Sequence, residues 1–392
     1  MNIFIIGNGM YTTGRGTVGY GTILPAIIEF QRKTEEIHNI YLIGSNVKNS
    51  KLAKIKYQKI SKLSKIKLNI KFFPLEKNNS NEYKKIIINN KNNKNSCAII
   101  STPDHLHYKM SKFCIINNIH TLVVKPLTPI LSEAKILTKL ANKYNVYGAV
   151  EFHKRFDKQN ILTKNKINNK NFGDILYNTV DYSQRKSIPT KIFKKWINKT
   201  NLLQYLGVHY VDLIYFLTNA IPTKIMVLGQ KSYLNKSKKI NSNDSLQCII
   251  KWKSPKGYFF NQILFLNWVD PENTSAMSDQ KFKIIFTNGR IEADQKNRGL
   301  EFINDTSNLE HPNPDFSYQF QDELNSNYWS GYGIDSITTF LRDCKNIFKK
   351  KITLNELALS RPTFKTSLVS CAVIEAGNKS LNNGSKWVKV NI

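Results

Sequence analysis

Short apolar segments alternate with helical patterns through the first 150 residues, and this alternation constrains the fold more than any other feature. Residues 3–6, 40–43, 98–101, 121–124 and 146–150 have the length and aliphatic content of buried strands. Between them, residues 24–32, 108–116 and 132–144 have the pattern of helices, and the last has a clear apolar face. Strands that alternate with helices predict a parallel, doubly wound sheet.

The rest of the chain has a different pattern. Strand-like segments follow one another directly, with turn signals such as Ser254-Pro255-Lys256-Gly257 between them, at residues 175–182, 224–230, 246–252, 258–266 and 282–286. Helices are predicted at 202–217, 334–348 and 364–376, and a final strand at 387–390. We therefore predict an α/β protein of two domains, residues 1–150 and 151–392, the second with an antiparallel or mixed sheet.

The charge of the chain is strongly positive. Lys and Arg total 58 against 28 Asp and Glu, which gives a formal net charge of +30. Only 8 of the basic residues are Arg, and the 50 Lys are spread evenly among Ile and Asn. Since base readout and bidentate phosphate contacts favour Arg, this pattern is typical of background composition, and we predict no specific nucleic-acid partner. The Asn- and Lys-rich tract at 77–94 is predicted to be an exposed helix or loop.

Cysteine spacing and hydropathy set the expected compartment. The five Cys include no CxxC pair and mostly lie in apolar runs, which is typical of buried free thiols in a reducing compartment. No apolar stretch approaches the roughly 20 residues needed to span a bilayer, and the first apolar run is too short for a signal peptide. We expect a soluble, cytoplasmic protein with no membrane partner. No His, Cys, Asp or Glu cluster has metal-ligand spacing, so no metal is predicted.

A glycine-rich segment follows the first strand. Gly7-Asn8-Gly9-Met10 has the glycines that permit a tight turn and close approach of backbone N–H groups to a pyrophosphate. The usual GxGxxG pattern would have its third glycine at position 12, where this chain has Thr12. The glycine-rich sequence continues through residues 14–21. This segment therefore predicts a dinucleotide site with an expanded loop, in which Gly21 takes the role of the third glycine and Arg15 reaches either phosphate or substrate.

The second strand ends without the acidic residue that would hold a ribose 2′-hydroxyl. The chain has Gly44-Ser45-Asn46 there, followed by Lys48 and Lys51. Serine and nearby cations tolerate or attract a 2′-phosphate, which favours NADP slightly over NAD. The alternative is that these lysines reflect only the general abundance of Lys.

Further candidate residues lie at the ends of later strands. Ser101-Thr102-Pro103-Asp104-His105-Leu106-His107 follows one strand, and Lys125-Pro126 follows the next, where ligands bind in such sheets. A lysine there can place its ammonium group beside a nicotinamide and a substrate hydroxyl. On the helix predicted at 202–217, Tyr205, His209 and Asp212 have the spacing of one helix face.

Taken in order, these motifs resemble the Gfo/Idh/MocA family of nicotinamide-dependent oxidoreductases that act on sugars and cyclitols. The resemblance rests on five motifs: Gly7-x-Gly9, Thr-Pro-Asp-His-Leu-His, Lys-Pro-Leu-Thr, Glu151-Phe152-His153-Lys154-Arg155-Phe156-Asp157 and Gly-x-His-x-x-Asp. It implies an N-terminal Rossmann domain for NAD(P), and a C-terminal α/β domain with a large open, mainly antiparallel sheet. It also implies a homo-oligomer, either a dimer or a tetramer, formed through that sheet.

The resemblance also implies roles for individual residues. The family's lysine falls on Lys125, although Val124 replaces the Glu that usually precedes it, and the catalytic histidine falls on His209. Tyr205 stands where many members carry Asp, which changes the expected proton route. Asp212 matches the family's acidic residue, with substrate contact and a structural anchor as equal alternatives.

The expected cofactor contacts are Gly7, Asn8, Gly9, Met10, Ser45, Thr102, Pro103, His105, His107 and Lys125. For His105 and His107 a structural role in the loop is an equal alternative. The expected substrate contacts are Lys125, His153, Arg155, Tyr205, His209 and Asp212; Arg155 holds an anionic substrate or anchors the crossover between domains. The predicted reaction is hydride transfer between NAD(P) and a hydroxyl or carbonyl carbon of a sugar-type molecule. A non-catalytic dinucleotide-binding sensor is the alternative function.

Overall fold

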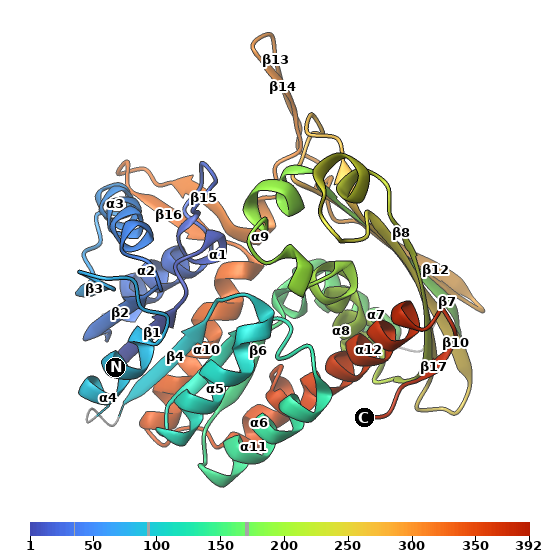
Figure 1. Cartoon of the computed structure of the whole chain (residues 1–392), viewed down its shortest axis with the longest axis horizontal. Helices are drawn as coiled ribbons and strands as arrows, with labels where there is room; N and C mark the ends of the chain where they lie inside the picture. The colour runs from blue at the N-terminus through green and yellow to red at the C-terminus, as the bar shows by residue number, and fades with distance from the viewer. Residues whose placement is uncertain (35, 92–94, 169–171) are drawn as a thin grey trace. The chain divides into compact units, whose positions relative to one another are not determined.

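The computed structural model describes residues 1–34, 36–91, 95–168 and 172–392 (Figure 1). By internal contacts the chain forms two compact units. The first contains Met1–Thr128, Ser132–Phe156 and Pro314–Ser367, and the second contains Pro129–Leu131, Asp157–Asn313 and Leu368–Ile392. The division into 1–150 and 151–392 stays a prediction. None of the helices in the described ranges is long and apolar enough to cross a membrane.

The first unit is built on a six-stranded parallel sheet, which confirms the predicted doubly wound architecture. Its strand order is β3-β2-β1-β4-β5-β6. The strands are β1 (Asn2–Ile6), β2 (Asn39–Ile43), β3 (Ile70–Phe73), β4 (Ser96–Ile100), β5 (His120–Val124) and β6 (Gly148–Glu151). Because both faces are covered, β1 and β4 are buried at every position, as their continuous aliphatic runs predict.

Helices from both ends of the chain cover this sheet. The earlier ones are α1 (Met10–Thr13), α2 (Ile23–Thr34), α3 (Val47–Ser64), α4 (Glu82–Asn90), α5 (His107–Ile116) and α6 (Leu131–Lys143). Helix α10 (Tyr332–Phe348) places Ile334, Ile337 and Phe340 in the same apolar core as Ile3 and Ile5. The unit also contains α9 (Pro314–Ser317), the hairpin β15 (Tyr318–Gln321) and β16 (Asn327–Ser330), and α11 (Leu354–Ser360).

The tract predicted as an exposed helix or loop forms α4, whose Tyr83, Ile86 and Ile87 are buried. Residues 92–94 of that tract lie outside the described residues. All five cysteines are buried and free.

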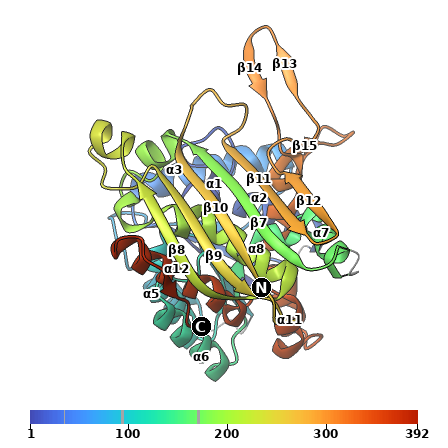
Figure 2. The same cartoon turned by 90° about the vertical axis from the view of Figure 1, so that its right-hand side faces the viewer.

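The second unit is built on a seven-stranded mixed sheet, which is antiparallel except where β7 pairs with β10. The order is β12-β11-β7-β10-β9-β8-β17. The strands are β7 (Ile175–Arg185), β8 (Ile221–Gln230), β9 (Ser245–Lys253), β10 (Phe259–Asp270), β11 (Ser278–Phe286), β12 (Gly289–Asp294) and β17 (Val388–Lys389). A separate hairpin, β13 (Phe302–Asn304) and β14 (Ser307–Glu310), extends away from this sheet (Figures 1 and 2).

Helices cover one face of the second sheet and leave the other open. Helices α7 (Lys158–Asn168), α8 (Val208–Thr218) and α12 (Phe364–Asn382) lie on the covered side, while Figure 2 shows the strands of the open face with no helix in front of them. Burial alternates along the strands accordingly: in β10, Phe260, Gln262 and Leu264 are buried whereas Phe259 and Phe265 are exposed. The predicted large, open and mainly antiparallel sheet is confirmed.

Candidate active site

The turn after β1 has the close backbone packing that its glycines predict. Gly7 has a φ of +115°, and a Cβ there would lie 2.0 Å from the carbonyl oxygen of Ser101. No atom lies within 4 Å of a Cβ built on Gly9, so the space beside it is open. Asn8 is 6% exposed, and its Nδ2 has no hydrogen-bond partner among the described residues. Open space beside glycine and an unsatisfied donor fit an approaching phosphate-bearing cofactor.

The segment after β4 is fixed largely by His107. Its ring is 1% exposed, with Nδ1 2.8 Å from the carbonyl oxygen of Pro126 and Nε2 2.8 Å from that of Thr102. Both ring nitrogens are therefore occupied within the protein, which favours the structural alternative for His107. Its place between two loops holds Thr102 and Pro103 close to the segment that carries Lys125. His105 is less buried, and its backbone N–H donates to the carboxylate of Asp104.

Lys125 follows β5 and is 8% exposed. Burial lowers its pKa from 10.5 to about 7, because a charged ammonium loses its hydration there, while the carboxylates of Glu151 and Asp104 act in the opposite direction. Lys125 therefore has a pKa close to neutral pH, which is suited to holding or releasing a proton in a reaction.

Glu151 lies near Lys125 and was not among the expected site residues. It ends β6, is 2% exposed, and pairs in register with Val124, the residue before the lysine. Its carboxylate accepts a hydrogen bond of 2.6 Å from Ser336 Oγ and lies 3.1 Å from His153 Nδ1. In the sequence it stands at the head of the Glu151–Asp157 motif, directly after a predicted strand, but no role was assigned to it there.

His153 lies in a cluster of aromatic rings within the first unit. Its ring centroid is 5.1 Å from that of Phe316, 5.6 Å from that of Tyr332 and 6.5 Å from that of Tyr11. The neighbouring Arg155 places its guanidinium group 5.8 Å from the ring of Phe152. Contact with a substrate stays a prediction for both residues.

His209 occupies the second position of α8 and is 4% exposed. The chain enters α8 through a π-helix, Leu203–Gly207, a rare element that is frequent at functional sites. Tyr205 lies in this wider turn, and its ring is 4.6 Å from Phe193 and 6.3 Å from Trp268 between centroids. Burial raises the pKa of Tyr205, so its phenol stays protonated and donates a proton in hydrogen bonds, unlike an ionised Asp.

Asp212, one turn after His209 on α8, is 2% exposed. The ring of Tyr182, from β7, lies 6.4 Å from that of His209. The second unit thus places Tyr205, His209 and Asp212 on one continuous helical segment against the sheet.

The first unit brings its predicted residues together at the carboxyl ends of the parallel strands. Ser45 follows β2 and is exposed, and its carbonyl oxygen accepts from the N–H of Asn79. The other predicted residues of this unit follow their strands in the same way: Gly7, Asn8, Gly9 and Met10 after β1, Thr102, Pro103, His105 and His107 after β4, Lys125 after β5, and His153 and Arg155 after β6. In the described part of the chain, no group of three or more His, Cys, Asp and Glu residues is arranged to hold a metal ion.

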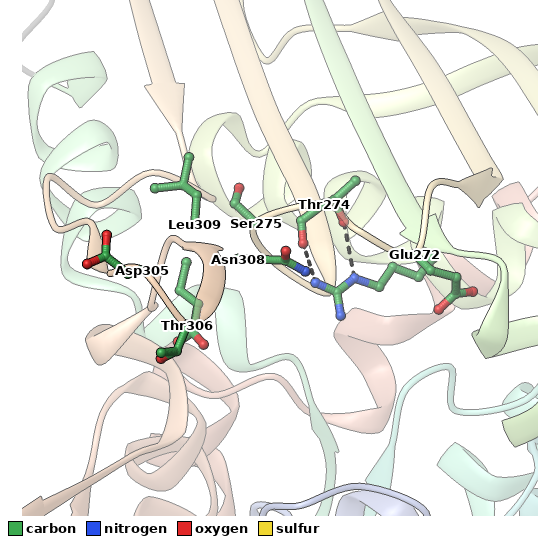
Figure 3. Close-up of a pocket in the computed structure, with 9 residues that line it drawn as sticks. Glu272, Thr274, Ser275, Asp305, Thr306, Asn308 and Leu309 are labelled. Carbon is green, nitrogen blue, oxygen red and sulfur yellow. Dashed lines mark hydrogen bonds between the residues drawn. The ribbon is translucent and has the colours of Figure 1, made fainter. Parts of the chain in front are cut away.

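A polar cavity of about 600 Å³ lies in the second unit beside the β13–β14 hairpin, whose turn contributes to its lining (Figure 3). It is lined by Arg185, Glu272, Thr274, Ser275, Asp305, Thr306, Asn308, Leu309 and Glu310. Arg185 Nε donates to Thr274 Oγ1 at 3.1 Å, and a second guanidinium nitrogen donates to the carbonyl oxygen of Thr274. None of the predicted site residues lines this cavity, and the sequence pattern of the hairpin gave no sign of it.

Residues 15–152 match the model of the Gfo/Idh/MocA oxidoreductase family, described as having an NAD-binding Rossmann fold. The chain is 28% identical over 116 residues to scyllo-inositol 2-dehydrogenase (NADP(+)) IolW of Bacillus subtilis. The aligned segment covers 29% of this chain and 32% of the relative. It is 26% identical over 125 residues to glucose-6-phosphate 3-dehydrogenase of the same organism, covering 30% and 35%. The chain thus matches about a third of the length of these relatives.

Solved structures resemble the whole chain. Myo-inositol 2-dehydrogenase from Lactobacillus plantarum superposes with a TM-score of 0.69 at 14% identity, covering 100% of this chain and 99% of that one. Scyllo-inositol dehydrogenase from Lactobacillus casei, solved with NAD(H) and scyllo-inositol, gives a TM-score of 0.68 at 12% identity, with the coverage 100% and 99%. At this identity the likeness establishes the two-unit fold.

Proposed function

We propose that the chain, whose residues 15–152 match the Gfo/Idh/MocA oxidoreductase family, transfers a hydride between NAD(P) and a hydroxyl or carbonyl carbon of a sugar, sugar derivative or cyclitol. The observation that carries the proposal is Lys125, a buried lysine with a near-neutral pKa at the carboxyl end of the parallel sheet. The inositol and glucose 6-phosphate dehydrogenases among the relatives support a polyhydroxylated substrate.

In the proposed reaction, different residues of the chain have different roles. A bound nicotinamide would supply the hydride acceptor or donor. Lys125, when protonated, stabilises negative charge on the reacting oxygen, and His209 accepts the hydroxyl proton as general base. Tyr205, four residues before His209, supplies a neutral hydroxyl group. Asp212 either contacts the substrate or anchors the helix. Gly7, Asn8, Gly9 and Met10 would form the phosphate-binding turn.

The cofactor is proposed as NAD(P), with NADP favoured. Neither Gly44, Ser45 nor Asn46 supplies a carboxylate for a ribose 2′-hydroxyl, and Lys48 lies close by on α3. One matched relative carries NADP(+) in its name.

The proposal is tested by thermal unfolding with NAD, NADP and their reduced forms, since a ligand that binds only the folded state raises the melting temperature. Turnover is then followed by nicotinamide absorbance with inositols, sugars and sugar phosphates. Lys125→Ala and His209→Ala should abolish turnover and keep cofactor binding. The exposed Lys139→Ala and His38→Ala serve as matched controls. No stabilisation by any dinucleotide, or wild-type turnover in either active-site variant, would overturn the proposal.

A non-catalytic sensor on the same fold is the second candidate. Val124 and Tyr205, where the family pattern has acidic residues, favour it. A sensor would bind dinucleotide and show no turnover with any substrate of the panel, whereas the retained Lys125 and His209 favour an enzyme.

We also propose that the chain forms a homo-oligomer through the open face of the second sheet. This face carries exposed Leu228, Phe259 and Phe265, with Asp181 and Lys281 paired across neighbouring strands. An exposed apolar patch of this kind marks an interaction surface, and the oppositely charged groups beside it allow the same face of a second copy to pair with it around a two-fold axis. Light scattering should show at least a dimer for the wild type and a smaller species for Phe265→Glu. A wild-type monomer at micromolar concentration would contradict the proposal.

A further inference from the structure

The expanded glycine loop, residues 14–21, is a closed excursion inserted between α1 and α2. The backbone N–H of Thr22 donates to the carbonyl oxygen of Tyr11 at 2.7 Å. This bond brings the residue before α2 back to α1, from which the loop departs. Gly14 and Gly21 have φ values of +68° and +75°. A Cβ on Gly14 would lie 1.9 Å from the carbonyl oxygen of Gly19. The loop therefore has a defined conformation that depends on these glycines.

Lys56 of α3 fixes the far end of this loop. Its Nζ lies 3.0, 3.2 and 2.8 Å from the carbonyl oxygens of Thr17, Val18 and Gly19. These bonds satisfy three carbonyl groups that the loop itself leaves unpaired, and they attach the loop to the helix that follows β2. The far end of the loop is therefore held against α3, the helix that begins where β2 ends and where a dinucleotide fold receives the adenosine ribose.

The near end of the loop presents a guanidinium group to the phosphate-binding turn. Arg15 Nη1 donates to Asn8 Oδ1 at 3.0 Å. The Asn8 amide packs against the end of β2, because a Cβ built on Gly44 would lie 2.3 Å from Asn8 Nδ2. Arg15 is thus positioned where the ends of β1 and β2 meet, and the buried Nδ2 beside it still lacks a partner among the described residues.

The residues that directly follow β2 are neutral. Gly44-Ser45-Asn46 contains no carboxylate, and the Asn46 side chain is engaged in capping α3 through the N–H of Asn49. The acidic residue connected to this segment is Glu82, whose carboxylate accepts from Asn79 Nδ2 at 2.7 Å. In this fold a carboxylate reads the 2′-hydroxyl of NAD, whereas an arginine accommodates the 2′-phosphate of NADP.

We propose that Arg15 binds the 2′-phosphate of NADP, with Asn8 holding its guanidinium group in place and the Asn8 amide and Ser45 hydroxyl as additional donors. The inference rests on the proposed dinucleotide-dependent function and assigns the preference for NADP to the inserted loop. The lysines of α3 are then not needed for this preference, apart from Lys56, which fixes the loop.

The test is calorimetric binding of 2′,5′-ADP and 5′-AMP, which differ in the 2′-phosphate, and of NADP and NAD. The wild type should prefer the 2′-phosphorylated member of each pair. Arg15→Met should weaken the binding of 2′,5′-ADP by about tenfold to a hundredfold, which is the usual contribution of hydrogen bonds to a charged group. The affinity for 5′-AMP should stay unchanged. Lys54→Met, which removes an exposed cation from α3, should change neither. Unchanged thermal unfolding of Arg15→Met checks that the variant folds.

Two outcomes separate the inference from the function on which it rests. Equal affinity of the wild type for both members of each pair, or equal losses for both in Arg15→Met, would overturn the role of Arg15 and leave dinucleotide binding in place. A preference for NAD that disappears in Glu82→Gln would assign the ribose to Glu82 instead. Failure of every nucleotide to bind would overturn the proposed function, and the inference with it.

Discussion

Replacing Glu151 with Gln should make Lys125 a weaker base. Burial, opposed in part by nearby carboxylates, lowers the pKa of this lysine to about 7, a net shift equivalent to about 5 kcal/mol against the charged form. Glu151 and Asp104 are the two carboxylates that oppose the shift. Gln keeps an oxygen that accepts from Ser336 but carries no charge, so the variant isolates the electrostatic contribution of the side chain.

The size of the effect follows from the burial of both groups. An opposite charge close to a buried ionisable group typically shifts its pKa by about 1 to 3 units. Loss of the Glu151 charge should therefore lower the pKa of Lys125 by about one unit or more. At pH 7 the protonated fraction would fall from about one half to about a tenth or less.

The assay needs no substrate. Trace labelling with a small amine reagent at a series of pH values, followed by peptide mass spectrometry, gives the titration midpoint of Lys125, with exposed Lys139 as an internal standard. Glu76→Gln removes an exposed carboxylate of the same unit and should leave the midpoint unchanged. A wild-type midpoint above about pH 9, or the same midpoint in Glu151→Gln as in the wild type, would refute the reasoning. In the active enzyme, the alkaline limb of kcat/KM should move to lower pH in Glu151→Gln.

Three further changes test other parts of the fold. Burial lowers the pKa of His120 from its ordinary value of 6.5 to about 4, so between these two pH values the unfolded chain binds more protons than the folded chain. The free energy of unfolding in urea should therefore fall by about 3 kcal/mol as the pH drops from 6.5 to 4. His120→Gln should remove this pH dependence. Arg298 and Asp157 form an ion pair of 2.8 Å with both side chains 1% exposed, so Arg298→Met should cost about 3–5 kcal/mol in urea unfolding, and adding Asp157→Asn should restore part of it. Gly14→Ala should disrupt the glycine loop and weaken dinucleotide binding in calorimetry, whereas Gly16→Ala, equally left-handed but with no atom within 4 Å of the new Cβ, should be milder.

Most strands of the two sheets were predicted, because their sequences are apolar throughout where both faces are buried and alternate where one face is buried; the edge strands β3 and β12 were missed. Residues 3–6 and 98–100 are continuous apolar runs, and β9 of the second sheet alternates in burial along its length. Helix α3 was missed because only Ser50, Ala53, Ile60 and Ser64 of its residues are buried. A lysine-rich helix with so narrow a buried stripe has almost no apolar periodicity to detect.

The candidate site was predictable only where a role follows from position along the chain. Gly7, Lys125 and His209 stand at strand ends or on a helix, and a motif specifies them. The proximity of Glu151 to Lys125 depends on the register in which β5 pairs with β6. No local sequence pattern in either strand specifies that register. The π-helix before His209 also had no local signal, since its residues pack there against β10 through Gly207 and Leu266.

Helix α10 has a consequence for how the chain acquires its structure during synthesis. The sheet formed by the first 151 residues shares its apolar core with a helix that lies near residue 340. On the ribosome this core stays incomplete until α10 has emerged, after every strand of the mixed sheet except β17 has been made. The nascent first unit therefore lacks part of its core for most of its synthesis, and a truncated chain ending after β6 would leave exposed the apolar surface that α10 covers.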